Sequence, residues 1–368
     1  MCRAMWILVA PWWWIADIVT YFVGLFTLIV LASLVAPRIA YRVSGRLGLY
    51  TAMMITGATI VLGGLITVAA ILRIFSEMDL AHLFYIALGL TLGTNLVVYL
   101  LSPYIIMAMT RARPAPPEIA RMVEDLAARS GLKKPKVLVV DMPPNAFAFG
   151  NFLSGRYIAI SSSLIDLLPR DELEAVVGHE IGHHVHRDNA LMMFLGLFPS
   201  MLYYLGRLAI SAGLWAGGPR ERESNRGYLL IVGIVAVIIS FLLQVVLLAF
   251  ARLREYFADI HGASLAGPRS MQRALARLHL YYTSRPRALE MVKNMSIRAL
   301  FIYAFVETFA EPFVSIDRIV ESLAEEGRRR RWFGLEEVFS THPPIPKRIA
   351  ALEDYRAIIE YKAAKLGS

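Results

Sequence analysis

Five long apolar runs divide the sequence, at residues 18–36, 51–72, 83–109, 190–216 and 228–250. Each is close to or above the roughly 20 residues that an α-helix needs to cross the hydrocarbon core of a bilayer. Hydrophobic residues make up 57% of the chain, which is high for an ordinary soluble domain. The sequence therefore predicts a mainly α, multi-span transmembrane helical bundle.

Charged residues in the short loops set the predicted orientation. Arg38, Arg42 and Arg46 crowd the loop between the first two runs, whereas the next loop mixes basic and acidic residues. Because basic residues are retained in cytoplasmic loops, we place the first loop in the cytoplasm and the N-terminus outside. Counting spans then puts residues 110–189, and everything after about residue 250, on the cytoplasmic side of the cell membrane.

The net charge of +9 has the same explanation. Basic loops at a membrane surface attract anionic lipid headgroups, so the excess of lysine and arginine does not require a nucleic acid. The expected partner is the lipid bilayer, and no nucleic acid is expected.

The predicted domain organisation follows from the spans. Residues 1–109 form an N-terminal transmembrane region with three spans, and residues 190–250 contribute two more. The polar residues 110–189 and 251–368 are then two parts of one folded domain, which the last two spans split in sequence. The stretch 297–314 is apolar but carries two glutamates, so it predicts either a buried or interfacial helix or a sixth span.

A small β-sheet is predicted in the first part of the polar domain. Residues 136–140 and 157–161 have the composition of short strands. Between them, residues 145–150 alternate small and aromatic side chains, as an exposed or edge strand does. The domain is therefore expected to combine helices with a minor sheet.

A metal-binding motif lies in the same part of the domain, within a predicted helix over residues 172–188. His179, Glu180 and His183 form an HExxH motif, whose two histidines lie one turn apart on one helix face. Both imidazoles can then reach one Zn²⁺, while Glu180 reaches the metal-bound water and acts as general base. Because Cys2 is the single cysteine, a cysteine-based zinc site is excluded.

Two residues compete for the role of third metal ligand. His186 lies on the same helix face as His179, but roughly 10 Å further along the axis, which is too far without a sharp bend. Glu255 follows the fifth apolar run directly, and two antiparallel spans return it to the membrane face where the HExxH helix ends. Glu255 is therefore the predicted ligand, and Asp259, one turn later, is placed to orient a ligand histidine. His184 and His186 are predicted to be structural.

Four blocks of sequence together resemble the HtpX-type membrane zinc metalloproteases, which are relatives of the CAAX prenyl endoproteases. The blocks are residues 144–150, the HEIGH run at 179–183 with Asp188, residues 254–259, and residues 341–344 leading to Arg348. The resemblance implies one zinc ion per chain, held by His179, His183 and Glu255, with Glu180 as the base. The departure from the family pattern is Phe149, where a small or hydroxyl residue is usual.

The resemblance also implies a substrate-binding strand and two further catalytic candidates. An extended substrate is expected to pair with the edge strand, whose residues are Asn145, Ala146, Phe147, Ala148 and Phe149. His342 and Arg348 are expected near the site, where an imidazole or a cation could stabilise the oxyanion. The alternative for Arg348 is a structural ion pair beside a helix start.

The predicted function is that of a membrane zinc metalloendopeptidase of the gluzincin type, with its catalytic domain in the cytoplasm. The resemblance implies polypeptide substrates, chiefly misfolded or damaged membrane proteins, and a role in stress response and protein quality control. Two alternatives remain open at this point. One is a CAAX-type prenyl-protein endoprotease, and the other is a non-catalytic membrane scaffold with a structural zinc.

Overall fold

The computed structural model describes residues 46–77, 81–215, 223–288, 290, 315–329 and 335–366. Within these residues, four helices are long and apolar enough to cross a membrane. They are α3 (Arg46–Glu77), α4 (Ala81–Thr110), α8 (Asp188–Trp215) and α9 (Glu223–Ala266). They match four of the predicted spans, whereas residues 18–36 and 297–314 lie outside the described residues.

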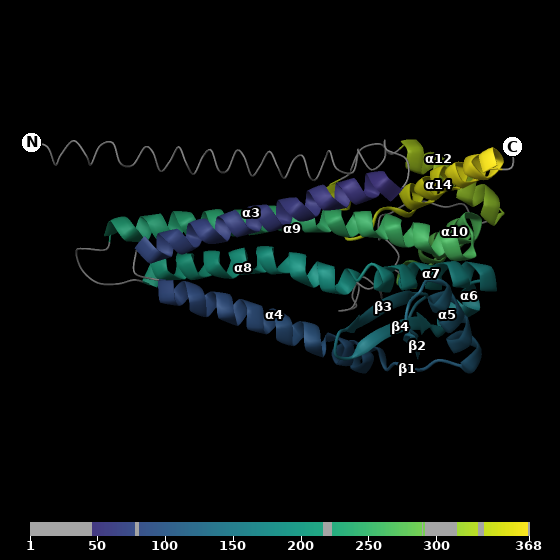
Figure 1. Ribbon diagram of the computed structural model, residues 1–368, viewed down its shortest axis with the longest axis horizontal. Coiled ribbons are helices and arrows are strands. Elements are labelled where there is room, and N and C mark those ends of the chain that lie inside the picture. The colour runs from purple at the N-terminus through teal and green to yellow at the C-terminus, as the bar shows by residue number, and fades with distance from the viewer. Residues whose placement is uncertain are drawn as a thin grey trace, which may run out of the picture.

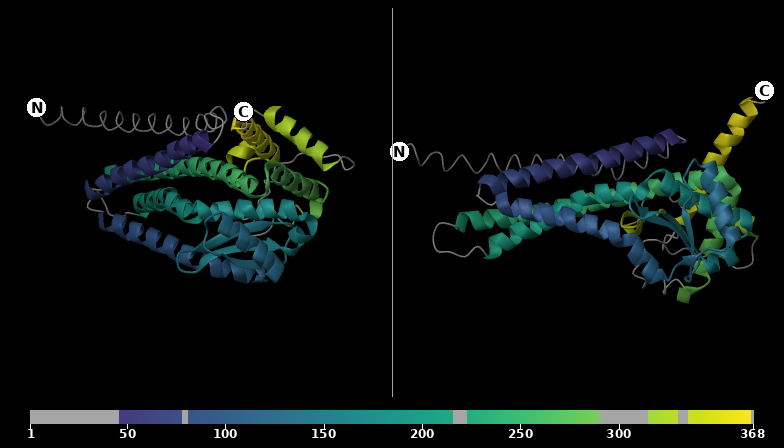
Figure 2. Two further views of the ribbon diagram at one scale, coloured as in Figure 1. Left: turned by 45° about the vertical axis from the view of Figure 1, so that its right-hand side comes forward. Right: turned by 60° about the horizontal axis from the view of Figure 1, so that its bottom comes forward.

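The four long helices form an elongated bundle with the polar domain at one end (Figure 1). Two further views show the same arrangement (Figure 2). Helices α8 and α9 pack along each other where Gly206 meets Gly233, since a Cβ added at Gly233 would lie 2.7 Å from the carbonyl oxygen of Gly206. Close approach through small residues is the usual device of packed membrane helices. Helix α3 packs on α9, and α4 packs on α8.

A four-stranded sheet lies beside the domain end of α4, with strand order β1-β2-β4-β3. Its strands are β1 (Arg113–Pro114), β2 (Lys136–Val140), β3 (Ala146–Asn151) and β4 (Gly155–Ser161). Strand β2 runs parallel to β4, and β3 pairs antiparallel with β4 at the edge of the sheet. The three predicted strands are confirmed. The two-residue strand β1 was not predicted, because it is short and contains a proline.

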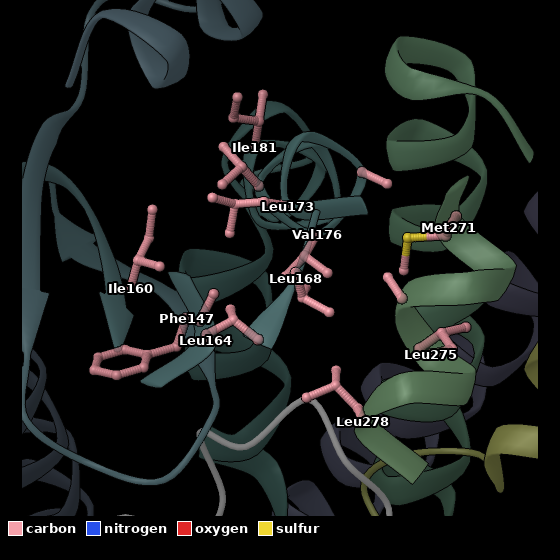
Figure 3. Packing of buried hydrophobic residues seen from close by; sticks show 14 of the residues in the cluster. Phe147, Ile160, Leu164, Leu168, Leu173, Val176, Ile181, Met271, Leu275 and Leu278 are labelled. Carbon is pink, nitrogen blue, oxygen red and sulfur yellow. The ribbon is translucent and has the colours of Figure 1, made fainter. Parts of the chain in front are cut away.

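Helices complete the domain on both sides of one central helix. Its helices are α5 (Pro117–Arg129), α6 (Ser162–Leu167), α7 (Arg170–Val185), α10 (Pro268–Thr283), α12 (Ile316–Arg329), α13 (Leu335–Val338) and α14 (Ile345–Leu366). Helix α7 lies between the sheet and α10, where Ile160, Val176 and Leu275 share one buried core (Figure 3). The helix that carries the HExxH motif is therefore held by apolar packing from two sides.

The end of α7 differs from the predicted helix over residues 172–188, which was too long. Helix α7 ends at Val185, and a new helix, α8, begins at Asp188. Arg187 between them has a φ of 56°, a left-handed conformation that breaks the helix without a glycine. The chain therefore changes direction directly after the motif, and Asp188 turns back toward it.

Candidate active site

Helices α7 and α9 approach each other closely beside the HExxH motif. The contact is made by Gly178 and Gly182 of α7 against Ala258, His261 and Gly262 of α9. A Cβ added at Gly262 would lie 2.4 Å from the carbonyl oxygen of Ala175, which leaves no room for any larger residue. This close crossing brings the α9 side chain of Glu255 in front of the two motif histidines.

Glu255 faces both histidines at equal distances. The Nε2 atom of His179 lies 3.6 Å from Glu255 Oε2, and the Nε2 atom of His183 lies 3.6 Å from Glu255 Oε1. Ligand atoms bound about 2.0–2.1 Å from a tetrahedral Zn²⁺ are themselves roughly 3.4 Å apart. The Oε2 atom of Glu255 is buried and has no hydrogen-bond partner among the described residues. These three side chains therefore fit one divalent metal ion, and their ligand atoms form a cluster of that kind.

His179 is oriented from behind by a buried carboxylate. Its Nδ1 donates to Asp259 Oδ1 at 2.9 Å, which leaves Nε2 to face Glu255. Asp259 in turn accepts from Arg348 Nε at 2.7 Å and from Arg348 Nη2 at 2.5 Å. The carboxylate thus fixes the tautomer of the histidine, and the arginine fixes the carboxylate. The geometry matches the placement predicted for Asp259.

His183 has a matching arrangement that sequence reasoning missed. Its Nδ1 donates to Asp188 Oδ2 at 2.6 Å, and the same oxygen lies 2.9 Å from Arg254 Nε. Asp188 reaches the histidine only because the chain reverses at Arg187. An aspartate in the first turn of a new helix was the available signal, because such residues mark helix starts.

Glu180 is buried beside the two histidines and contacts the edge strand. Burial raises the pKa of its carboxyl, and a backbone hydrogen bond from Ala148 acts in the opposite direction. A carboxyl whose pKa is raised toward neutrality is better suited to accept and return a proton than an exposed one. Glu180 therefore combines the position and the environment of a general base.

His342 lies close to Glu255, on the loop before α14. Its Nε2 is 3.5 Å from Glu255 Oε2, and its Nδ1 lies 2.9 Å from the hydroxyl of Thr341. Burial lowers the pKa of His342 to about 4, so the imidazole is neutral near pH 7. A neutral imidazole at this place can donate a hydrogen bond without adding charge.

Arg348 is fully buried and is directed at Asp259. Burial opposes the charge on its guanidinium, but Asp259 and Glu255 raise its pKa above the usual value. Its nearest approach to the ligand carboxylate is 4.0 Å, from Nη1 to Glu255 Oε2. Of the two roles weighed for Arg348, these distances describe the ion pair rather than a direct contact with an oxyanion.

The predicted substrate strand lies at the edge of the sheet, with its aromatic side chains turned into the domain. Phe149 stacks on Tyr157 with ring centroids 5.0 Å apart, and Phe147 belongs to the buried core. Asn145 is buried, and its backbone N–H donates to Ser161 Oγ. Phe149 is therefore a core residue, so its departure from the family pattern changes internal packing.

The two remaining histidines, His184 in α7 and His186 directly after it, make contacts within the domain. His184 Nε2 donates to the carbonyl oxygen of Tyr157 at 2.9 Å, and burial lowers the pKa of His184 to about 4. His186 packs edge-on against Phe257 and His261. The contacts of both point away from the cluster of His179, His183 and Glu255.

Comparison with known proteins gives a consistent picture. The family model "Peptidase family M48" matches residues 115–356. A Protease HtpX homolog of Pyrobaculum aerophilum is 46% identical over 91% of this chain and 96% of its own length. Another of Pyrobaculum calidifontis is 48% identical over 90% and 95%, and one of Archaeoglobus fulgidus is 42% identical over the same shares. The crystal structure of S. mikatae Ste24p aligns with a TM-score of 0.48 at 19% identity, covering 84% of this chain and 67% of that one.

Proposed function

Because this chain belongs to peptidase family M48, we propose that it is a zinc-dependent endopeptidase of the membrane that hydrolyses peptide bonds through a metal-activated water. One observation carries the proposal. The Nε2 atoms of His179 and His183 and the carboxylate of Glu255 converge on one point, with Glu180 beside it. A structural zinc site would be closed by a fourth protein ligand, whereas three protein ligands leave one position for water.

Zinc is the metal that this donor set favours. Two imidazole nitrogens and one carboxylate, presented from an HExxH helix, suit Zn²⁺ better than the hard cations that prefer oxygen ligands. When bound, Zn²⁺ lowers the pKa of its water and polarises the scissile carbonyl. The paired carboxylates Asp259 and Asp188 support this binding by holding both histidines with Nε2 directed inward.

Three further residues of the chain have separate roles in the proposed reaction. Glu180 takes the proton of the attacking water and returns it to the leaving amine. His342, neutral and close to Glu255, donates a hydrogen bond to the oxyanion of the tetrahedral intermediate. Arg348 acts as a positioning residue, because its guanidinium holds Asp259 and through it the ligand His179.

The edge strand β3 is the proposed binding site for extended substrate. Its free edge can add one more strand through main-chain hydrogen bonds, which do not depend on substrate side chains. The backbone of Ala148 in this strand lies close enough to Glu180 to lower the pKa of its carboxyl. A chain paired with residues 145–149 would therefore pass beside the catalytic base.

The proposed substrates are misfolded or damaged membrane proteins, cut on the cytoplasmic side as part of protein quality control. Two observations support this choice. The relatives are HtpX homologues that share nearly their whole length with this chain, and the site lies next to the ends of spanning helices. The basic first loop supports a cytoplasmic domain through the positive-inside rule.

The test compares bound metal and cleavage in the full-length protein, in detergent and in lipid vesicles. Glu180→Gln should keep about one zinc per chain and lose cleavage of casein and of an unfolded membrane protein. Glu255→Ala should lose the metal. The matched control is Glu118→Ala, an exposed glutamate of α5, which should change neither quantity. Cleavage that survives Glu180→Gln would refute the mechanism, and a strict preference for farnesylated peptides would favour the prenyl-protein alternative.

A further inference from the structure

The turn between β3 and β4 exposes two large apolar side chains. Phe152 is 73% exposed and Leu153 is 68% exposed. Turn tips of polar domains normally carry small or polar residues. The hairpin is also rigidly closed, since a Cβ added at Gly150, whose φ is 127°, would lie 2.0 Å from the carbonyl oxygen of Gly155. The shape of the tip is therefore fixed, and its two apolar residues are not folded into the domain.

The base of the same turn is bonded to a membrane helix. Asn151 Nδ2 donates to the carbonyl oxygens of Tyr99 at 2.9 Å and Leu100 at 3.1 Å, both in α4. Pro103 lies inside this helix and has no N–H, so the carbonyl of Tyr99, four residues earlier, loses its helical donor. A carbonyl in a spanning helix needs a partner because lipid supplies none. Two side chains donate to this oxygen instead: Ser102 Oγ of the same helix, at 2.9 Å, and Asn151 Nδ2 from the hairpin.

Asn151 also fixes the turn itself. Its Oδ1 accepts from the backbone N–H of Leu153 at 3.0 Å and from that of Ser154 at 2.9 Å. One side chain thus holds the tip in shape with its oxygen and docks it on α4 with its nitrogen. The position of the tip is consequently tied to the position of the spanning helix.

The surface around the docked tip is apolar. On α4, Val97, Val98 and Leu101 are exposed large hydrophobic residues, and the Tyr99 ring lies 6.2 Å from that of Phe152. These residues belong to the candidate span Ala81–Thr110, of which only 11% of the window is buried within the protein. The tip therefore continues the exposed apolar surface of a helix that is long and apolar enough to cross a membrane.

We propose that the β3–β4 hairpin tip is a membrane-inserted anchor, with Phe152 and Leu153 seated among lipid acyl chains beside α4. The partner is the bilayer itself, because the tip is bonded to a spanning helix and continues its apolar surface. One consequence rests on the proposed function: the edge strand β3, whose last residue is Asn151, then ends at the membrane boundary. An extended segment pulled out of the bilayer would meet the binding strand as it emerges.

The test measures how deep the tip lies in the bilayer. A nitroxide label is placed at Leu153→Cys in a Cys2→Ser background of the full chain, in vesicles of phosphatidylcholine and phosphatidylglycerol. Collision rates with oxygen and with a water-soluble nickel chelate report the depth. The references are Val98→Cys on the span and Lys134→Cys on the domain, whose side chain is 71% exposed. We expect the ratio of oxygen to nickel collision rates at Leu153→Cys to lie within about twofold of the ratio at Val98→Cys.

Three results would overturn the proposal. The first is a ratio equal to that of the Lys134 label, which would place the tip in water. The second is spin–spin broadening that disappears on dilution with unlabelled protein, which would make a second copy the occupant. The third is an unchanged depth in Asn151→Ala, which is expected to release the tip and raise nickel collisions at least threefold. None of these readings requires catalytic activity, so they stand apart from the test of the proposed function.

Discussion

The two halves of helix α9 differ in the side chains that they require, although they form one continuous helix. The half that lies in the bundle exposes Ile231, Ile234 and Phe241 and carries no charged residue after its first turn until Arg252. The half that enters the domain buries Glu255 and Asp259 among matched partners. The first half therefore needs only apolar character, whereas the second needs particular side chains at particular distances.

The charged half also holds the loop that carries His342. Arg252 is buried, and its Nη1 donates to the carbonyl oxygens of Val338 at 3.1 Å and Ser340 at 2.8 Å. A second buried pair, Lys347 Nζ with Glu337 Oε2 at 2.6 Å, closes the same segment onto the start of α14. Because Lys347 and Glu337 are both buried, removal of either one leaves the charge of the other uncompensated.

The largest effect is expected from Arg348→Ala. The substitution leaves Asp259 buried without its cation, which costs about 3–5 kcal/mol of stability and loosens the orientation of His179. Thermal unfolding in detergent and zinc content measure the two consequences. Arg356→Ala is the matched control in the same helix, because its partners are partly exposed surface glutamates. Equal losses of stability and zinc from Arg348→Ala and Arg356→Ala would contradict the distinction between buried and exposed ion pairs.

A somewhat smaller effect is expected from Gly262→Ala. The added methyl group meets the carbonyl oxygen of Ala175 and pushes α9 away from α7, at a cost of about 1–3 kcal/mol. Glu255 then moves from the histidines, so zinc content should fall together with stability. Gly233→Ala, at the crossing within the bundle, should lower stability with zinc retained. Gly89→Ala meets nothing within 4 Å and serves as the neutral control. Zinc retained in Gly262→Ala would show that the close crossing does not place the ligand.

Asp188→Asn tests a carboxylate that the sequence analysis named but did not place beside His183. The amide keeps the shape but loses the charge that pairs with His183 and Arg254. Zinc affinity or kcat/KM should fall about 10- to 100-fold, as is typical when a supporting carboxylate is removed. Competition with a chromophoric chelator measures the affinity. An exposed carboxylate of the same domain, Asp166→Asn, should leave it unchanged.

The smallest effect is expected in the apolar half of α9. Ile234→Leu exchanges one lipid-facing aliphatic residue for another, and should change stability by less than about 0.5 kcal/mol with cleavage unaffected. Thermal unfolding and casein cleavage are again the measurements. A loss of activity here would mean that the two halves of the helix do not differ as described.

Local sequence patterns predicted most of the fold and the approach of His179, His183 and Glu255 to one another. Apolar runs, alternation and the HExxH spacing depend on periodicity along one element, so they are visible in sequence. Asp259 was predictable for the same reason, since it lies one helical turn after Glu255. The approach of Glu255 to the two histidines followed from the antiparallel return of the chain after two spans.

The features that sequence reasoning missed depend on contacts between distant elements. Asp188 reaches His183 because Arg187 adopts a left-handed conformation that carries no glycine signal. The role of Gly262 depends on the α7 backbone opposite it, and the role of Asn151 depends on the α4 carbonyl oxygens to which it donates. Such roles arise from tertiary geometry, which no single segment encodes.

Because α9 is one continuous helix, a change in its tilt within the bundle would displace Glu255 at the site. From its crossing with α8 at Gly233 to Glu255 the helix extends for roughly 33 Å, so a change in tilt of about 2° moves the carboxylate by about 1 Å. Displacements of that size at a reacting centre cost about 100-fold in rate. The tilt of a spanning helix responds to bilayer thickness. We therefore expect bilayer thickness to affect the distance between Glu255 and the two histidines.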